Sequence, residues 1–305
     1  MIPSVYIIAG PTAIGKSEFA LNLAKKLNGN IINADSMQVY KQLKILTARP
    51  KNEETKKIDH HLYGYIDAIN RFNVERWCND AKEKINHCHK NNITPILVGG
   101  TGMYIDKLIN GIIDIPSIPE SLKLESEILI EKKGLKNFYN LIEEFDPIAL
   151  KKINTNDKNR LRRIWEVYIH TGKTLSEWNN LGTKFFLKNI KYKLIIFLPD
   201  REKNYQKVNL RFVSMFKKGA IEEVKKLLKL NLNSSMPIMR AHGVPEIKKY
   251  LENKIDKDTC IHRSQQVTRN YVKRQHTWWR SSKLQIFKKF SQFPSEIDIN
   301  LMNFS

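Results

Sequence analysis

Short apolar runs alternate with amphipathic segments over the first third of the chain. Residues 5–9 (VYIIA), 31–32 and 96–98 are continuous apolar runs, each followed by glycine or a polar residue, as in buried parallel strands. Residues 18–27 carry apolar side chains at helical spacing, and Asn73 is a suitable N-cap for a helix running to about residue 90. Strand, helix and strand in this order predict βαβ units and a parallel sheet.

The pattern changes after about residue 111. Residues 114–119 carry two prolines, which favours a linker, and residues 120–188 show helical spacing without a convincing strand. Strand character returns at residues 194–198 (LIIFL), and three long helices are predicted at residues 203–217, 221–229 and 258–280. We therefore predict an α/β core domain, residues 1–114 and 193–305, interrupted by an all-helical insertion domain at residues 115–192.

The composition excludes several classes of protein. Of the 305 residues 41% are hydrophobic, which is enough for a packed core and too much for a disordered chain. No apolar run approaches the roughly 18 residues that cross a bilayer, and the first residues lack the basic segment of a signal peptide. The three cysteines, Cys78, Cys88 and Cys260, show no CxxC spacing, so we expect no disulfide framework and a reducing, cytoplasmic location.

The chain is strongly basic. Its 52 Lys and Arg against 31 Asp and Glu give a formal charge of +21, which attracts polyanions, although AT-rich coding would produce a similar bias. Residues 263–289 hold eight Lys or Arg and no acid, with Tyr271, Trp278 and Trp279 between them. Such a segment suits nucleic acid, but for the two tryptophans we favour packing into the protein interior.

One glycine-rich loop points to phosphate. Residues 10–17 (GPTAIGKS) fit G-x-x-x-x-G-K-[ST] and lie between a predicted strand and a predicted helix, which is the context that the pattern requires. Backbone N–H groups, the helix N-terminus and a lysine would then surround a di- or triphosphate, and Ser17 would bind Mg²⁺. The core is accordingly predicted to be a P-loop NTPase-like sheet. The residues of this loop are Gly10, Pro11, Thr12, Ala13, Ile14, Gly15, Lys16 and Ser17.

The magnesium-binding aspartate of ordinary kinases and ATPases is not evident. The strand at residues 96–98 ends in Gly-Gly-Thr-Gly, and Asp200 comes late and after a proline. Asp35 follows the second strand, which places it at the carboxyl edge of a parallel sheet beside the phosphate loop. Such an acid binds a metal, accepts a proton, or only caps a turn, and the residues themselves leave these alternatives open.

Six strings along the chain form a recognisable set. They are GPTAIGKS (10–17), NADSMQVY (33–40), ILTARP (45–50), PILVGGTGMY (95–104), NRLRRIWEVYIHTGKTLSEW (159–178) and TRNYVKRQHTWWR (268–280). Together they resemble the tRNA dimethylallyltransferase (isopentenyl-tRNA transferase, IPP transferase) family, in the family's order and over nearly the whole chain. The phosphate loop alone is generic, whereas GPTAxGKS together with DSMQVY and VGGTG is specific.

The resemblance implies a reaction. A dimethylallyl group would pass from dimethylallyl diphosphate to N6 of the adenosine at tRNA position 37, giving N6-dimethylallyladenosine and diphosphate, in tRNAs that read codons beginning with U. The phosphate loop would hold the prenyl donor, so ATP would not be the substrate. Asp35 would accept the proton of the adenine amine, Thr101 would lie near the reacting centre, and Arg211 would contact the diphosphate.

The same resemblance implies contacts with tRNA, strongly salt-dependent where arginines meet phosphates. Residues 240–245 (RAHGVP) depart from the family, because many members carry a G-Y-[KR]-E-like string there; Gly243 and Glu246 stand in for it. The residues with implied tRNA contacts are Asp35, Ser36, Met37, Gln38, Thr101, Lys123, Asn159, Arg160, Leu161, Arg162, Arg163, Arg240 and Gly243.

Other chemistry-bearing residues suggest structural roles. His87, Cys88 and His89 are adjacent on a predicted helix and point in different directions, which argues against a metal site with Cys78. His60 and His61 are expected to form structural hydrogen bonds.

Three alternatives to a monomeric, magnesium-dependent tRNA prenyltransferase remain. An enzyme that prenylates free adenine nucleotides should lack a long basic insertion; a P-loop kinase should turn over ATP; and an RNA-binding module should be indifferent to Asp35→Asn.

Overall fold

The computed structural model describes residues 4–151, 153–188 and 190–303. The chain forms two compact units, Met1–Ile109 with Phe186–Ser305, and Asn110–Phe185. We expected the second to span residues 115–192. It begins and ends earlier in the chain because the antiparallel strands β5 (Ile112–Ile113) and β6 (Thr183–Lys184) pair where the chain enters and leaves it. The sequence pattern did not reveal this short ladder.

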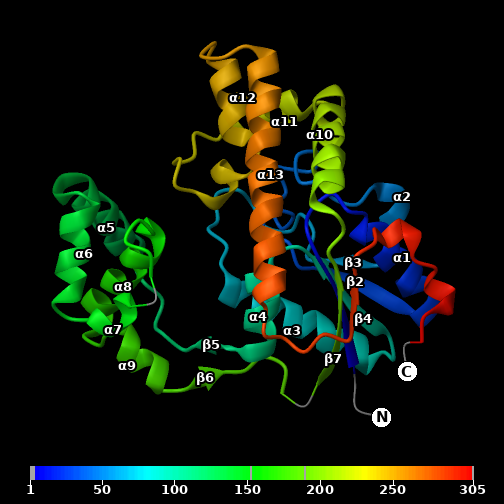
Figure 1. The fold of residues 1–305 in the computed structure, drawn as a ribbon, viewed down its shortest axis with the longest axis horizontal. Coiled ribbons are helices and arrows are strands. Elements are labelled where there is room, and N and C mark those ends of the chain that lie inside the picture. Colours follow the sequence, from blue (N-terminus) through cyan, green and yellow to red (C-terminus); the bar gives the residue numbers. More distant parts are fainter. Residues whose placement is uncertain (1–3, 152, 189, 304–305) are drawn as a thin grey trace. The chain divides into compact units, whose positions relative to one another are not determined.

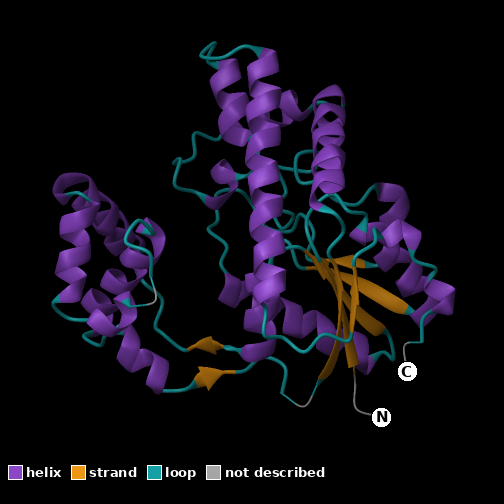
Figure 2. Cartoon of the chain, viewed as in Figure 1, coloured by secondary structure: helices purple, strands orange, loops and turns teal. Residues whose placement is uncertain are grey.

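A six-stranded sheet, parallel throughout, forms the centre of the first unit, as expected for this fold class (Figure 2). Its order β3-β2-β4-β1-β7-β8 places β1, the strand that leads into the phosphate loop, between β4 and β7. The short outer strands β3 and β8 were not predicted, since two or three residues carry no recognisable period. The strands are β1 (Ser4–Ala9), β2 (Gly29–Asn33), β3 (His60–His61), β4 (Thr94–Gly99), β7 (Lys191–Phe197) and β8 (Lys288–Phe290).

Helix α1 (Lys16–Leu27) covers one face of this sheet. Its Phe19 and Leu23 join a buried cluster with Ile8 and Val98, and Phe19 meets the Phe197 ring edge-on with centroids 4.9 Å apart. Alternate strand residues are buried on the opposite face, where α3 packs on β2 and β4. Asn73 is the N-cap of α3, as predicted, and accepts the Arg76 amide proton. The helices on this part of the chain are α2 (Asn52–Thr55), α3 (Val74–Lys90) and α4 (Gly102–Asn110).

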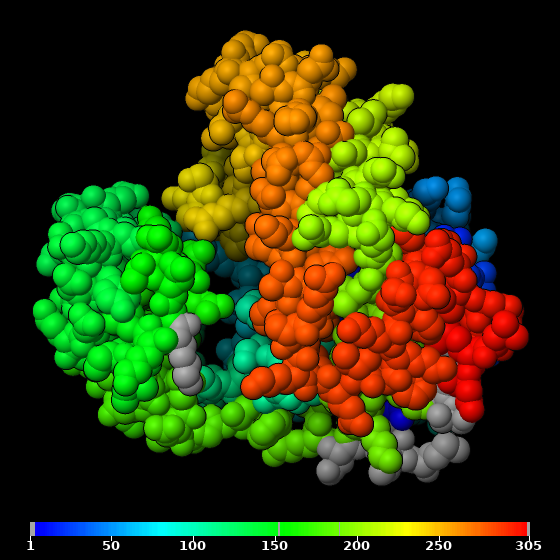
Figure 3. Space-filling view, in the orientation of Figure 1, coloured from blue at the N-terminus to red at the C-terminus, as the bar shows by residue number. Residues whose placement is uncertain are grey.

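A second group of helices stands side by side beyond the carboxyl edge of the sheet (Figure 1). The long helix α13 packs against both α10 and α12, and its outer side forms the orange strip in Figure 3. All three predicted helices are present, whereas α12 was missed because Gly243 and Pro245 interrupt its pattern. These helices are α10 (Arg201–Lys217), α11 (Ala220–Leu228), η1 (Pro237–Arg240), α12 (Val244–Leu251) and α13 (Lys257–Ser281), followed by η2 (Pro294–Glu296) and η3 (Ile299–Leu301).

The second unit is helical apart from its short ladder. Its apolar core joins Phe138, Ile142, Leu161 and Trp165 from different helices, each at most 5% exposed. The helices are α5 (Glu120–Lys133), α6 (Leu135–Glu143), α7 (Pro147–Leu150), α8 (Lys158–Thr171) and α9 (Leu175–Asn180). No helix among the described residues combines the length and apolar character needed to cross a membrane.

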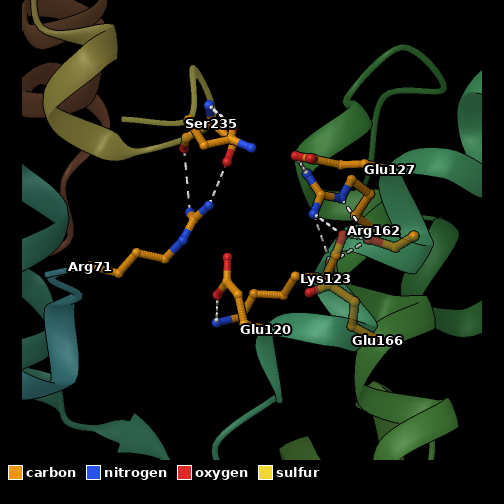
Figure 4. Close-up of polar contacts among 9 residues, drawn as sticks. Arg71, Glu120, Lys123, Glu127, Arg162, Glu166 and Ser235 are labelled. Atoms are coloured by element: carbon orange, nitrogen blue, oxygen red, sulfur yellow. Dashed lines mark hydrogen bonds and ion pairs between the residues drawn. The ribbon is translucent and has the colours of Figure 1, made fainter. Parts of the chain in front are cut away.

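An ion-pair network joins α5 to α8 in this unit (Figure 4). The Arg162 guanidinium pairs with Glu127 and lies 3.2 Å from Glu166, and it also donates to the Ser126 hydroxyl at 2.8 Å and the Lys123 carbonyl at 2.7 Å. The Glu166 carboxylate accepts the Ser126 hydroxyl proton at 2.7 Å. Because Arg162 and Glu166 are only 13% and 7% exposed, this arginine holds the unit together from inside.

We predict that Arg162→Ala lowers the free energy of unfolding by about 3 kcal/mol, since it leaves the buried Glu166 without its counter-ion. Arg160→Ala is the matched control, because its guanidinium is 64% exposed and its pair with Asp157 contributes about 0–1 kcal/mol. Denaturant unfolding of both variants measures the difference. Equal losses would show that Arg162 has no internal structural role.

Candidate functional site

The phosphate loop lies between β1 and α1, where the carboxyl ends of β1, β2 and β4 meet. Two glycines make this geometry possible. Gly10 has φ of 145°, and a Cβ there would collide with the Phe197 carbonyl oxygen. Gly15 has φ of 97° and is the N-cap of α1, so the first amides of that helix open toward the loop.

Lys16 lies inside this loop with its ammonium group donating to the Pro11 carbonyl at 2.5 Å. Burial lowers its pKa to about 7, because the charged form loses water; Asp35 raises the pKa, and the Arg211 charge lowers it further. An anion bound in this loop would raise the pKa of Lys16 again and so favour its charged form.

Arg211 reaches the same loop from α10. Its guanidinium donates to the Thr12 hydroxyl at 2.7 Å. Burial lowers its pKa to about 10, against the opposing effect of Asp35, so it remains cationic at neutral pH. Two cations that are separated by 195 positions in the chain thus converge on one loop.

Asp35 lies just beyond β2 and lines the same cavity as Lys16 and Arg211. Its Oδ1 accepts the amide protons of Met37 at 2.8 Å and Gln38 at 3.3 Å, which closes a turn. Asn33 orients the start of that turn by accepting the Asp35 amide proton at 2.9 Å. One carboxylate oxygen therefore shapes the backbone, and Oδ2 is not needed for that purpose.

Thr101 connects the Asp35 turn to the loop after β4. Its hydroxyl accepts the Ser36 amide proton at 3.2 Å and also interacts with the half-buried Tyr271 side chain. Gly102 next to it allows the Trp278 indole to approach, since a Cβ there would collide with that ring.

Two adjoining cavities open at this edge. The one of about 270 Å³ is lined by the phosphate loop with Lys16 and Ser17. The other, of about 400 Å³, has a larger apolar share, with Leu46, Phe212 and Met215 in its wall. Thr12, Asp35, Thr47 and Arg211 line both cavities, so an anion in the first can carry an apolar group into the second.

Two family models match this chain. The model of the family described as IPP transferase matches residues 38–282, and that described as Isopentenyl transferase matches residues 3–72. The chain belongs to the IPP transferase family. It is 43% identical over 279 residues to the tRNA dimethylallyltransferase of Ehrlichia ruminantium, covering 91% of this chain and 92% of that one. It is 41% identical over 302 residues to that of Wolbachia pipientis wMel, covering 98% and 96%.

Solved structures of IPP transferases have the same fold. One, from crystallographic snapshots of a eukaryotic dimethylallyltransferase acting on tRNA, matches with a TM-score of 0.81 and 30% identity, covering 98% of this chain and 76% of that one. Another, the tRNA isopentenylpyrophosphate transferase of Bacillus halodurans, matches with a TM-score of 0.68 and 28% identity, covering 98% and 92%.

The residues with implied tRNA contacts lie in both units. In the first, Ser36, Met37 and Arg240 line the larger cavity beside Asp35. Gly243 has no side chain that could contact a partner. It is the N-cap of α12 with φ of 94°, and a Cβ there would collide with Phe212 and come close to Leu46. Gln38 lines the smaller cavity and donates to the carbonyl oxygens of Thr47 and Ala48.

In the second unit the implied contacts divide into exposed and internal residues. Asn159, Arg160 and Arg163 are exposed on α8, and Lys123 is half-buried on α5. Leu161 is fully buried, so its side chain is not available to a partner, and Arg162 is held in the ion-pair network.

The two tryptophans of α13 have different positions. Trp279 is 1% exposed, as we expected, whereas Trp278 is 38% exposed with its ring edge against Gly102. The reason is helical spacing, because neighbouring positions point about 100° apart and only one of them faces the interior.

His60 and His61 form hydrogen bonds as expected, with the Ile58 carbonyl at 2.7 Å and the Asn30 amide at 3.2 Å. Over residues 4–151, 153–188 and 190–303, no group of three or more His, Cys, Asp or Glu is arranged to hold a metal ion.

Sequence reasoning missed several residues of the site. Glu223 on α11 accepts three successive amide protons, those of Lys44, Ile45 and Leu46, within 2.9 Å, and so fixes the loop that brings Thr47 to both cavities. His242 lines the larger cavity with its ring against Tyr271, and burial lowers its pKa to about 4, so it is neutral. No local pattern identifies such residues, because their partners lie far away in the sequence.

Arg71 connects two segments that line the larger cavity. Its guanidinium donates to the Ser235 hydroxyl at 2.6 Å and to the Ser235 carbonyl at 3.3 Å (Figure 4). This contact joins the segment before α3 to the segment before η1, and both contribute to the cavity wall.

We predict that pyrophosphate binding weakens as the pH rises through about 7. Only protonated Lys16 attracts the anion, and the bound anion in turn raises the pKa of Lys16. The affinity for pyrophosphate should therefore be highest below about pH 6 and should fall by up to about tenfold per pH unit above about pH 7. Calorimetry with magnesium pyrophosphate measures this. Lys16→Arg is the control, because its guanidinium stays charged; the same pH slope in both proteins would contradict the assignment.

We also predict that Glu223→Gln loosens the loop of residues 44–46, because amide bonds to a neutral acceptor are weaker than bonds to a carboxylate. Hydrogen exchange of these three amides should accelerate about tenfold. Glu222→Gln, at the exposed neighbouring position, should leave their exchange unchanged. Unaltered exchange in Glu223→Gln would show that the carboxylate does not hold the loop.

Proposed function

We propose that this protein transfers a dimethylallyl group from dimethylallyl diphosphate to N6 of the adenosine at position 37 of tRNA, forming N6-dimethylallyladenosine and diphosphate. The observation that carries the proposal is the position of Asp35 on the cavity that Lys16 and Arg211 also line. A buried cationic cradle suits a departing diphosphate, and a carboxylate beside it suits a proton acceptor. Relatives named tRNA dimethylallyltransferase support the same choice.

On the donor side, the loop amides, Lys16 and Arg211 would hold the diphosphate in the smaller cavity. As the bond between the allylic carbon and the diphosphate oxygen breaks, its electron pair leaves with the oxygen. Both cations offset that growing charge, and their burial makes the interaction stronger than in water. The prenyl group would extend toward Leu46, Phe212 and Met215 in the larger cavity.

On the acceptor side, adenine N6 would form the new bond to the allylic carbon. The amine is a weak nucleophile because its lone pair is delocalised into the ring, and Asp35 would accept its proton on Oδ2 while Oδ1 keeps the turn closed. The adenosine must leave its stack to reach this cavity, where Tyr271 and His242 offer ring faces and edges.

Magnesium fits the residues present. Ser17 lines the smaller cavity together with Asp35, and both offer the oxygen atoms that Mg²⁺ prefers. The ion would be held by the Ser17 hydroxyl and by the donor's own phosphate oxygens, and when bound it supplies positive charge to the leaving group.

For tRNA we propose contacts by Asp35, Ser36, Met37, Gln38, Thr101, Arg240 and Gly243 in the core unit, and by Lys123, Asn159, Arg160 and Arg163 in the helical unit. The helical unit favours tRNA over a free nucleotide as acceptor, because its exposed cations have no role toward a small molecule. We further propose that the tRNAs are those reading codons that begin with U, and that the protein acts as a cytoplasmic monomer, since one basic chain suffices for one anticodon arm.

The decisive test is Asp35→Asn. Asparagine keeps an Oδ1 that accepts the Met37 and Gln38 amide protons but does not accept the amine proton, so transfer should fall by about 10²–10⁴-fold with tRNA binding preserved. Nucleoside analysis of tRNA after incubation with dimethylallyl diphosphate measures transfer, and filter binding measures affinity.

Asp67→Asn is the matched control. The Asp67 carboxylate closes a similar turn by accepting the Ile69 amide proton at 3.2 Å, but it does not line either cavity. Full transfer by Asp35→Asn would refute the proton-acceptor role. Prenylation of AMP with none of tRNA, or steady release of phosphate from ATP, would refute the proposed function.

A further inference from the structure

We infer that Gln275 on α13 is a positioning residue, which holds the donor loop and the Asp35 turn at a set spacing. The inference rests on the proposed function. The Gln275 side chain is 4% exposed and hydrogen-bonds two loops, the phosphate loop and the loop after β4.

The carboxamide of Gln275 forms one bond to each loop. Its Oε1 accepts the Thr12 amide proton at 2.9 Å, and its Nε2 donates to the Gly100 carbonyl at 2.9 Å. Gly100 makes room for this arrangement, because a Cβ there would collide with the Gln275 Nε2 atom. A carboxamide is the side chain that both accepts and donates in one plane at neutral pH.

The contacts continue from Gln275 to the acid. Gly100 is directly followed by Thr101, whose hydroxyl accepts the Ser36 amide proton at 3.2 Å, and Tyr271 interacts with the side chains of both Gln275 and Thr101. Ser36 follows Asp35 directly. Hydrogen bonds at Gln275 and Thr101, linked by the backbone from Gly100 to Thr101, therefore connect the donor loop at Thr12 to the residue after the proposed proton acceptor.

Two features suggest that these hydrogen bonds position the reacting groups and do not only hold α13 in place. First, the Thr12 amide belongs to the phosphate loop, yet it is bonded to Gln275, and the Thr12 hydroxyl is bonded to Arg211. Gln275 thus sets where the first turn of the loop and one of its cations lie. Second, a different glutamine of α13 already anchors the helix to the fold: Gln265 donates to the Asn209 carbonyl at 3.1 Å.

The test compares Gln275→Ala, which removes two hydrogen bonds of α13, with Gln265→Ala, which removes one. Gln275→Ala should lower kcat about 10- to 100-fold, because a shift of about 1 Å between the reacting groups has that effect. The KM for tRNA should stay within about twofold, and pyrophosphate binding measured by calorimetry should weaken by less than tenfold. Gln265→Ala should lose a similar amount of thermal stability and keep kcat.

Gln275→Glu supplies a readout that a purely structural role would not move. A protonated glutamic acid accepts from Thr12 and donates to Gly100 as glutamine does, whereas the carboxylate has no proton for Gly100. The ratio of Gln275→Glu to wild-type kcat should therefore rise toward one at low pH and fall as the pH increases. Lys16, Asp35, Arg211, Tyr271 and His242 around the cavities are present in both proteins, so the ratio removes their effects.

The outcomes separate the two claims. If the wild type makes no N6-dimethylallyladenosine, the proposed function fails. If the wild type is active but Gln275→Ala keeps kcat within twofold, or loses it no more than Gln265→Ala does, or if the Gln275→Glu ratio is independent of pH, the positioning role is overturned.

Discussion

The site depends on the cost of keeping two cations away from water. Lys16 and Arg211 approach the same loop, and both lose hydration there, which is why the pKa of each is lowered. Asp35 is the nearby opposite charge that offsets part of this cost. The charges in the loop therefore lack full compensation, and an anion bound there would complete the balance that Asp35 begins.

The parallel sheet makes that balance possible. Since β2, β4 and β1 are neighbours that run in the same direction, the loops that follow them emerge together at one edge. The phosphate loop, the Asp35 turn and the Gly-Gly-Thr-Gly turn are therefore adjacent although they are distant in the chain. The helices α10, α11 and α13 then add Arg211, Glu223 and Gln275 from above the edge.

The parts of the molecule that sequence predicted are those with a local signature. β1, α1 and the loop between them follow from an apolar run, a helical period and two glycines, and Asp35 follows from the strand before it. Arg162 shows the limit: the family resemblance implied a contact with tRNA, whereas its internal ion pair with Glu127 on α5 joins residues 35 positions apart, which no local pattern predicts. Glu223 and Gln275 have no local signature at all, because a glutamate or a glutamine on a helix is ordinary until its distant partner is known.

The hydrogen bond between Thr12 and Gln275 also has a consequence for the order of events during synthesis of the chain. The two residues are separated by 263 positions, so a ribosome has exposed the phosphate-loop sequence long before it makes the helix that fastens it. During synthesis the loop's strand lacks β7 on one side and its amide lacks a partner. A half-made chain therefore carries the recognisable loop before α13 exists, so the bond that ties the loop to this helix forms late, after α13 has been synthesised.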